Sequence, residues 1–216
     1  MAYMLQRHRT GRLVELERVR TRIAADLHDE IGSSLSQIAI LSEVTREQIR
    51  SGSGAATDTA GEIAASARTM LDSMSDIVWS IDPRRDSLSS LVQRVNKFAS
   101  DVLESRGVAW SFEAPESLDR IKLTPEQRRQ INLILKEAVH NASRHAAAKA
   151  VALRISVTDH QLLAEVRDDG CGFRTDGEPN GYGLASMRAR AGQLKGQLRI
   201  RSETGQGTQV SLQVPL

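Results

Sequence analysis

Three clusters of polar and glycine residues in the second half of the chain could carry chemistry. The first is "LKEAVHNASRHA", in which Glu137, Asn141 and His145 lie four residues apart. This spacing puts them on one face of a helix, beside an apolar stripe. Glutamate and asparagine oxygens are hard ligands that suit Mg²⁺, which usually keeps substrate phosphates in its coordination shell. The cluster indicates a site for Mg²⁺ and phosphate, although a solvated polar strip would have the same spacing.

The second cluster is "DDGCGF", where Asp168 and Asp169 end a predicted strand and Gly170 and Gly172 follow. A carboxylate at such a turn can accept a hydrogen bond from an exocyclic amine, such as that of adenine. The glycines would let a ligand approach the main chain closely. A plain turn at the end of a strand would use the same residues.

The third cluster is "GYGLASMRARA", in which Gly181 and Gly183 open a predicted helix that contains Leu184. Backbone N–H groups at the start of a helix attract phosphate. The later segment "TGQGT", with Gly207 and Thr208, could add further donors or form only a hairpin turn. These glycines match neither the phosphate-loop pattern GxxxxGK[ST] nor the dinucleotide-binding fingerprint.

A mixed sheet covered by helices on one face is expected to hold the three clusters. We predict helices at about 87–106, from 124 and at 184–194, and strands at about 108–114, 151–157, 162–166, 197–203 and 208–214. Thr124, Pro125 and Gln127 have the marks of a capped helix start. Helices on one face of a mixed sheet form an α+β layer, so residues 84–216 are predicted to form an α/β-sandwich domain.

The first 83 residues have a helical pattern. No proline occurs in 12–48, and apolar residues recur there every three or four positions, which predicts one long helix. A turn rich in glycine and serine follows at 50–59. The next helix carries an apolar heptad seam and should end near Asp82, because Pro83 disfavours helical geometry before it. The seam consists of Ile63, Ala67, Met70, Met74, Ile77 and Ile81.

Such an antiparallel helical hairpin has too little apolar surface for a closed core. Pairing with a second copy would produce a four-helix bundle, so we expect a homodimer. The predicted domains are therefore a dimerisation hairpin at 1–83 and a sandwich domain at 84–216.

Composition restricts the compartment and the partners. The 216 residues have a net charge of +2 and only 3% aromatic residues, which gives no support to a nucleic-acid partner. Cys171 is the only cysteine, which favours a reducing compartment such as the cytoplasm. No apolar run reaches the ~18 residues of a membrane span. Six arginines between Arg7 and Arg22 could nevertheless follow a membrane segment, as in the cytoplasmic part of a membrane-bound sensor.

The order of the clusters carries a family resemblance. E-x-x-x-N, D-x-G-x-G, G-x-G-L and G-x-G-T resemble the N, G1, G2 and G3 boxes of the ATPase fold shared by gyrase, the mismatch-repair ATPases and histidine kinases. With "RIAADLHDEIGSSLSQI" upstream, residues 20–216 resemble the core of a sensor histidine kinase whose phosphoacceptor box reads L-H-D. The phrases "NASRHAAA", "NGYGLASMRARA" and "SETGQGTQVSLQVP" are similar to that subfamily as well.

The resemblance implies an ATP-dependent protein-histidine kinase. His28 would attack the γ-phosphate, since a neutral imidazole is a nucleophile near pH 7, and Asp29 would act as general base or orienting group. Glu137 and Asn141 would hold Mg²⁺. Adenine would be recognised by Asp168, with Asp169 as the alternative. The other implied nucleotide-binding residues are His145, Gly170, Gly172, Gly181, Gly183, Leu184, Gly207 and Thr208.

The resemblance also implies a partner, the receiver domain of a response regulator, whose aspartate would take the phosphoryl group. Ser33 stands where this subfamily commonly has a glutamine associated with dephosphorylation of the regulator, which leaves phosphatase activity open. Two other functions stay possible at this point. A serine kinase of the anti-sigma-factor type would not need the hairpin that carries His28, and a non-catalytic nucleotide-binding dimeric scaffold would not need four intact boxes.

Overall fold

The structure is a computed structural model in which two compact units follow each other along the chain. The first unit ends at Ile81 and the second begins at Asp82. The residues that the structure describes are 31–32, 34–52, 54–174 and 182–216.

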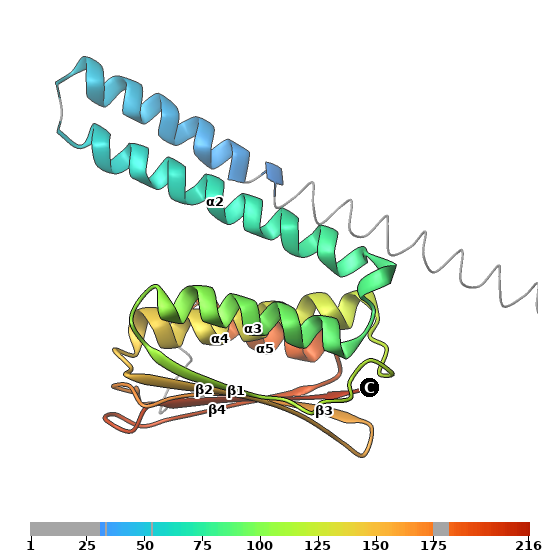
Figure 1. The fold of residues 1–216 in the computed structure, drawn as a ribbon. Coiled ribbons are helices and arrows are strands. Elements are labelled where there is room, and N and C mark those ends of the chain that lie inside the picture. Colours follow the sequence, from blue (N-terminus) through green and yellow to red (C-terminus); the bar gives the residue numbers. More distant parts are fainter. Residues whose placement is uncertain (1–30, 33, 53, 175–181) are drawn as a thin grey trace, which may run out of the picture. The chain divides into compact units, whose positions relative to one another are not determined.

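The first unit is a helical hairpin (Figure 1). Residues 34–50 are helical, and helix α2 spans Ala56–Ile81. Gly52 lies in the turn between them with a positive φ of 71°. The Thr59 hydroxyl donates a hydrogen bond of 2.8 Å to Gln48 Oε1, which ties the two helices together beside the turn. The predicted pair of long helices is thus confirmed for the described residues.

The chain changes direction directly after α2. Asp82 has an extended backbone conformation, and Pro83 opens the short 3₁₀ helix η1 (Pro83–Arg85). The cause is the one expected from the sequence, because a residue before proline is pushed out of helical geometry. Asp82 also caps η1, since its Oδ1 accepts a hydrogen bond of 3.0 Å from the Arg84 N–H.

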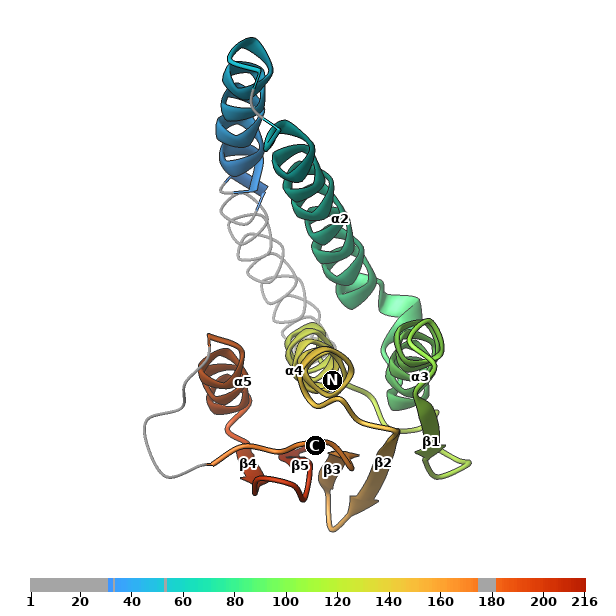
Figure 2. The ribbon, with the colours of Figure 1, turned by 90° about the vertical axis from the view of Figure 1, so that its left-hand side faces the viewer.

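The second unit is a sheet covered on one face by helices, as predicted (Figures 1 and 2). After η1 it contains α3 (Leu88–Glu104), β1 (Ala109–Glu113), α4 (Pro125–His145), β2 (Ala150–Thr158), β3 (Gln161–Asp168), α5 (Tyr182–Gln193), β4 (Gln197–Ser202) and β5 (Thr208–Pro215). Within the described residues the sheet order is β1-β2-β3-β5-β4. β1 pairs with β2 in parallel, and the other pairs are antiparallel.

The core of the second unit lies between the sheet and the helix layer. Strand side chains alternate between the two faces, so every second residue is buried along β3 and along most of β2 and β5. α3 and α5 flank α4 over this buried face (Figure 2). Buried strand residues include Val151, Leu153, Ile155, Leu162, Ala164, Val166, Val210, Leu212 and Val214.

Helix α4 carries the first cluster of candidate residues, and its start is fixed by local hydrogen bonds. The Thr124 hydroxyl accepts from the Gln127 N–H at 3.1 Å, and Gln127 Oε1 accepts from the Thr124 N–H at 2.9 Å. The predicted capping box is therefore present. It sets where α4 begins and hence which of its residues face the sheet.

Candidate functional site

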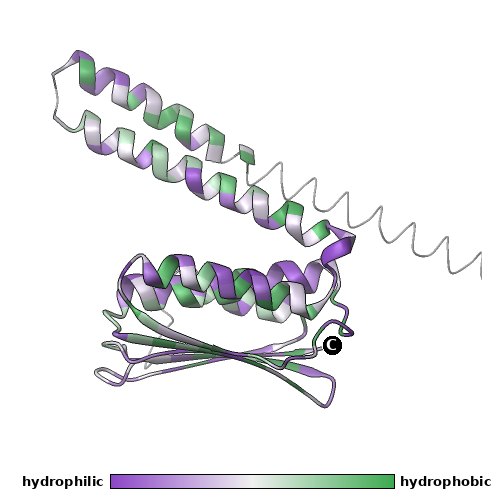
Figure 3. Ribbon diagram, in the orientation of Figure 1, coloured by the Kyte–Doolittle hydropathy of each residue, from purple (hydrophilic) through white to green (hydrophobic). Residues whose placement is uncertain are grey.

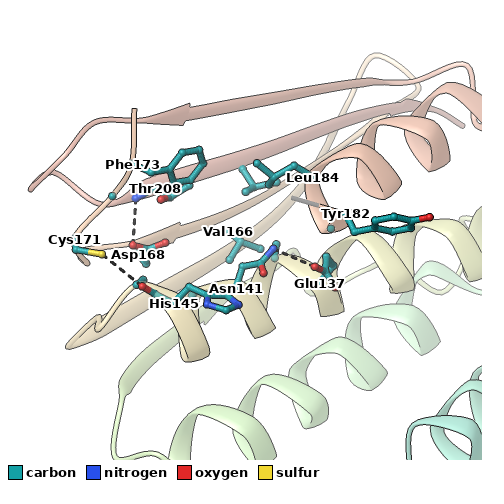
Figure 4. Close-up of a pocket in the computed structure, with 16 residues that line it drawn as sticks. Glu137, Asn141, His145, Val166, Asp168, Cys171, Phe173, Tyr182, Leu184 and Thr208 are labelled. Carbon is teal, nitrogen blue, oxygen red and sulfur yellow. Dashed lines mark hydrogen bonds between the residues drawn. The ribbon is translucent and has the colours of Figure 1, made fainter. Parts of the chain in front are cut away.

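A cavity of about 440 Å³ opens between α4, the ends of β3 and β5, and the start of α5 (Figure 4). This volume lies within the range of small-molecule sites. Predicted residues that line it are Glu137, Asn141, His145, Asp168, Gly172, Gly183, Leu184 and Thr208. The fold therefore brings parts of all four sequence motifs to one cavity.

Glu137 and Asn141 lie one turn apart on the face of α4 that lines the cavity (Figure 4). Asn141 Nδ2 donates a hydrogen bond of 3.2 Å to Glu137 Oε1. Because the amide nitrogen is used in this way, the Asn141 carbonyl oxygen is left as an acceptor. The described residues include no group of three His, Cys, Asp or Glu side chains placed to hold a metal. A cation bound at these two oxygens would need phosphate or water ligands as well, which is the usual situation for Mg²⁺.

Asp168 ends β3 and is only 6% exposed. Its Oδ1 accepts hydrogen bonds from the N–H of Gly170 at 3.0 Å and from that of Thr208 at 3.2 Å. Neither bond involves Oδ2, for which the described residues offer no donor. The carboxylate is thus held from one side and keeps one oxygen available to a ligand in the cavity.

Asp169, the alternative to Asp168, has a different position. Its Oδ1 accepts from the N–H groups of Ala150 and Lys149, at 2.9 and 2.8 Å. These two backbone hydrogen bonds hold the pKa of the Asp169 carboxyl below its usual value. Asp169 does not line the cavity. It fastens the end of β3 to the start of β2.

Gly183 allows the start of α5 to lie against α4. A Cβ at position 183 would come within 2.0 Å of Glu137 Oε1 and 3.6 Å of Asn141 Nδ2. Gly172 has a φ of 57°, and a Cβ there would lie 2.0 Å from the Glu203 carbonyl oxygen. Both glycines thus permit close approaches that shape the cavity wall.

Gly170 and Gly207, which the sequence assigned to nucleotide binding, do not line the cavity. A Cβ at Gly170 would lie 2.2 Å from the Ala146 carbonyl oxygen. A Cβ at Gly207 would lie 2.1 Å from the Asp168 carbonyl oxygen. In this structure both glycines allow two backbone segments to lie in close contact.

Apolar residues that the sequence did not single out form much of the cavity wall. Figure 4 shows Asp168 and Thr208 at one side, Glu137 at the other, and Val166 between them. The Cys171 Sγ lies 3.5 Å from the His145 carbonyl oxygen and also lines the cavity. Val166 of β3 and Val210 of β5 point from the sheet into the buried face, and the sequence analysis did not identify them as part of a cavity wall. The added lining residues are Ala138, Ala142, Ala146, Val166, Cys171, Phe173, Tyr182 and Val210.

Some of the residues discussed from the sequence lie outside the described part of the chain. They are His28 and Asp29, which carry the predicted catalytic roles, Ser33, which stands where the subfamily commonly has glutamine, Gly181 of the third motif, and the six arginines between Arg7 and Arg22. Their roles stay predictions.

Two family models match the chain. Residues 126–216 match the family described as "Histidine kinase-, DNA gyrase B-, and HSP90-like ATPase", and residues 19–86 match the family described as "Histidine kinase". The first match covers the cavity and the second covers the hairpin. The chain thus contains a histidine kinase region followed by an ATPase domain of this class, which together form a two-component histidine kinase core.

Curated relatives agree with this assignment, and a solved structure has a similar fold. The chain is 32% identical to sensor histidine kinase DesK of Bacillus subtilis, over 96% of this chain and 53% of that protein. It is 28% identical to the signal transduction histidine-protein kinase/phosphatase UhpB of Salmonella typhimurium, over 98% of this chain and 42% of that protein. The chain therefore spans about half the length of the curated relatives it matches.

The fold is similar to that of the histidine kinase domain from the Erythrobacter litoralis EL346 blue-light activated histidine kinase. The TM-score is 0.55 at 22% identity, over 84% of this chain and 96% of that one. Among the residues that the structure describes, no helix has the length and apolar character needed to cross a bilayer.

Proposed function

We propose that this chain is an ATP-dependent protein-histidine kinase that phosphorylates itself on His28. The observation that carries the proposal is the single cavity in which Asp168, Asn141 and Gly183 come together from three different elements. These are the residue types expected at the adenine end and at the phosphate end of a nucleotide site.

The cavity suggests an orientation for ATP. The free Oδ2 of Asp168 would accept a hydrogen bond from the adenine amine, and Val166 would contact the base. The phosphates would then extend toward Asn141 and the first turn of α5, whose N–H groups favour negative charge. His145 lines the same cavity and would lie near the phosphates.

In the proposed reaction an imidazole nitrogen of His28 attacks the γ-phosphorus atom of ATP. A nitrogen–phosphorus bond forms, the bond from the γ-phosphorus to the bridging oxygen breaks, and ADP leaves. Asp29 would accept the imidazole proton or orient the ring. Glu137 and Asn141 would hold Mg²⁺, which when bound neutralises phosphate charge and fixes phosphate geometry.

The phosphoryl group would pass from His28 to an aspartate on a response-regulator receiver domain. We further propose that the hairpin pairs with a second copy, because several large apolar residues of both helices are exposed. Because the proposed reaction consumes ATP, we expect the chain to act in the cytoplasm or on the cytoplasmic side of a membrane-bound sensor.

Labelling with ATP tests the proposed reaction. The full chain is incubated with Mg²⁺ and ATP labelled in the γ-phosphate, and the expected label is acid-labile, alkali-stable and absent from His28→Ala. The matched control is His160→Asn, which changes a histidine in the β2–β3 turn where φ is 60° and asparagine is tolerated. Label on a serine of an added partner would support a serine kinase instead, and no label at all would support a non-catalytic scaffold.

Cys171 offers a separate test of where the nucleotide binds. It is the only cysteine, it is exposed, and it lines the cavity. Saturating ATP should slow alkylation of its thiol by a maleimide by about fivefold or more, because a bound nucleotide would cover the Sγ atom. An unchanged rate at a concentration that supports labelling would place the nucleotide elsewhere.

A further inference from the structure

The second unit opens with the turn Asp82–Arg85, and one buried side chain fastens this turn to α4. Arg128, near the start of α4, donates a hydrogen bond of 2.8 Å from NH1 to the carbonyl oxygen of Asp82. The other hydrogen bonds and ion pairs of residues 82–85, within the described part of the chain, stay inside the turn. Asp82 pairs with Arg84 and Arg85, and the Arg85 N–H donates to the Asp82 carbonyl. These internal bonds make the turn stiff without attaching it to anything else.

The chain directly after this turn is held independently. The Leu123 N–H donates to the Asp86 carbonyl at 2.7 Å, and the Leu88 N–H donates to the Ile121 carbonyl at 2.9 Å. Lys122 Nζ adds a contact of 2.8 Å to Asp86 Oδ1. From Asp86 onward the chain is therefore part of the sheet-and-helix unit, and the stiff turn before it depends on Arg128.

Stability alone gives a poor account of Arg128. The side chain is 1% exposed, and its Nε has no acceptor among the described residues. Its NH1 bond to Asp82 ends on a neutral carbonyl. Burial lowers the pKa of the guanidinium, while Asp86 and Asp82 act in the opposite direction. A buried charge with incomplete hydrogen bonding usually costs stability relative to an apolar side chain of similar size.

The connection between α2 and the turn held by Arg128 is very short. α2 continues to Ile81, and Asp82 alone separates it from η1. A tilt of α2 is therefore passed directly to the turn that Arg128 holds. In phosphoryl transfer the attacking atom must lie in line with the leaving group, and a displacement of about 1 Å can cost on the order of 10²-fold in rate.

We propose that Arg128 is a positioning residue for autophosphorylation, which fixes the Asp82–Arg85 turn and so limits the angles at which the ATP-bound unit can approach the phosphoacceptor helix. This inference rests on the proposed kinase function. Arg128 does not line the nucleotide cavity, so its effect should fall on the transfer step and not on ATP binding.

Initial rates of autophosphorylation of the full chain, measured over a range of ATP concentrations, test the inference; kcat here is the rate constant for labelling at saturating ATP. Arg128→Met should lower kcat at least about tenfold and leave the KM for ATP within about twofold of wild type. Hydrogen exchange at the amides of Arg84 and Arg85 should become faster, because the turn has lost its anchor, whereas the Leu88 amide, which is bonded to Ile121, should not change. The matched control is Arg154→Met, which removes an exposed arginine that pairs with Glu113 at 2.8 Å. It should change neither kcat nor the exchange rates.

A second variant keeps the Arg128 bond and removes only the stiff connection. One glycine inserted between Ile81 and Asp82 should also lower kcat with little change in KM, and this variant answers the question if Arg128→Met does not fold. An unchanged kcat in either folded variant would overturn the inference, as would equal losses of ATP affinity and kcat in Arg128→Met. If wild type itself takes no label, the kinase proposal fails, whereas the exchange measurement still shows whether Arg128 anchors the turn.

Discussion

The two units of the chain differ in how far their large apolar side chains are buried. In the second unit, large side chains from the helices and the sheet, such as Leu91, Ile131 and Leu162, are fully buried. In the hairpin, four large aliphatic side chains are 61–66% exposed, and Figure 3 shows apolar positions along both of its helices. These four are Ile40, Ile49, Leu71 and Val78.

This difference separates two kinds of site. Every wall of the cavity that the structure describes comes from one sheet and its helices, within one chain. The exposed stripe on α2, formed by Leu71, Met74, Val78 and Ile81, repeats every three or four residues and has the spacing of a helix–helix contact. A hairpin of this kind is expected to need a second copy, whereas the ATPase unit is not.

Acidic residues placed on the exposed stripe of α2 should weaken dimerisation, and this is the largest effect that we expect. Leu71→Glu combined with Val78→Glu should weaken dimerisation by at least about 100-fold, since each buried aliphatic side chain contributes roughly 1.5–3 kcal/mol and the dimer contains two copies. ATP affinity should not change. Analytical ultracentrifugation and a fluorescent nucleotide measure the two quantities.

The control for this prediction lies on the same helix. Ala65→Glu combined with Thr69→Glu adds the same charge at two exposed positions on the side of α2 away from the stripe. This variant should remain dimeric. A dimer that survives in the Leu71 and Val78 variant would show that the stripe is not the contact surface.

Replacing Asp168 or Asp169, one at a time, with asparagine tests which of the two carboxylates contacts the adenine. In Asp168→Asn the amide oxygen must accept the hydrogen bonds from the N–H groups of Gly170 and Thr208. The NH₂ group then stands at the position of the free Oδ2. A donor then faces the adenine amine, and ATP should bind roughly 10- to 100-fold more weakly, the value of a hydrogen bond to a charged group. Asp169→Asn should leave the affinity within about twofold, measured by calorimetry.

Equal losses of ATP affinity in the two aspartate variants would contradict this assignment. They would mean that both carboxylates act through the shape of the turn. A loss confined to Asp169→Asn would move the adenine contact to the other face of the sheet edge, where Asp169 lies.

Local features of the fold could be predicted well from the sequence. The capping box of α4 and the end of α2 before Pro83 depend on residues within three or four positions of each other. The strand order β3-β5-β4 depends on pairing over some forty residues, and no local pattern specifies it. The alternation of β3 does put Asp168 on the same face as Leu162, Ala164 and Val166.

What the sequence could not provide was the contact each candidate residue makes. The Asp169 carboxylate accepts hydrogen bonds from the N–H groups of Lys149 and Ala150, about twenty residues earlier in the chain. The cavity wall at Phe173 and Val210 is likewise a product of tertiary packing. Glycines could be recognised as places of close approach, but whether a ligand or another backbone approaches them depends on the assembled fold.

Gly183→Ala should have a smaller effect on the cavity than Asp168→Asn. The added Cβ would meet the Glu137 carboxylate, which can rotate away because it is the end of a flexible side chain. That rotation would disturb the Asn141 hydrogen bond, and ATP affinity should fall about three- to tenfold. Gly192→Ala, on the same helix with open space around it, is the matched control and should bind ATP normally. Equal affinities of the two variants would argue against close packing of α5 on Glu137.

The smallest expected effect concerns the role of Asp169 in holding the strand ends together. Its pKa in the folded state is below the usual 3.8, because the N–H groups of Ala150 and Lys149 bind the charged form. The stabilisation is therefore complete above pH 3.8 and is lost as the pH falls through the lowered folded pKa. Asp169→Asn should lower the urea midpoint at pH 7, and the gap to wild type should narrow at pH 3 and below, followed by circular dichroism. A gap of the same size at both pH values would show that the charge of Asp169 does not contribute to holding β3 to the start of β2.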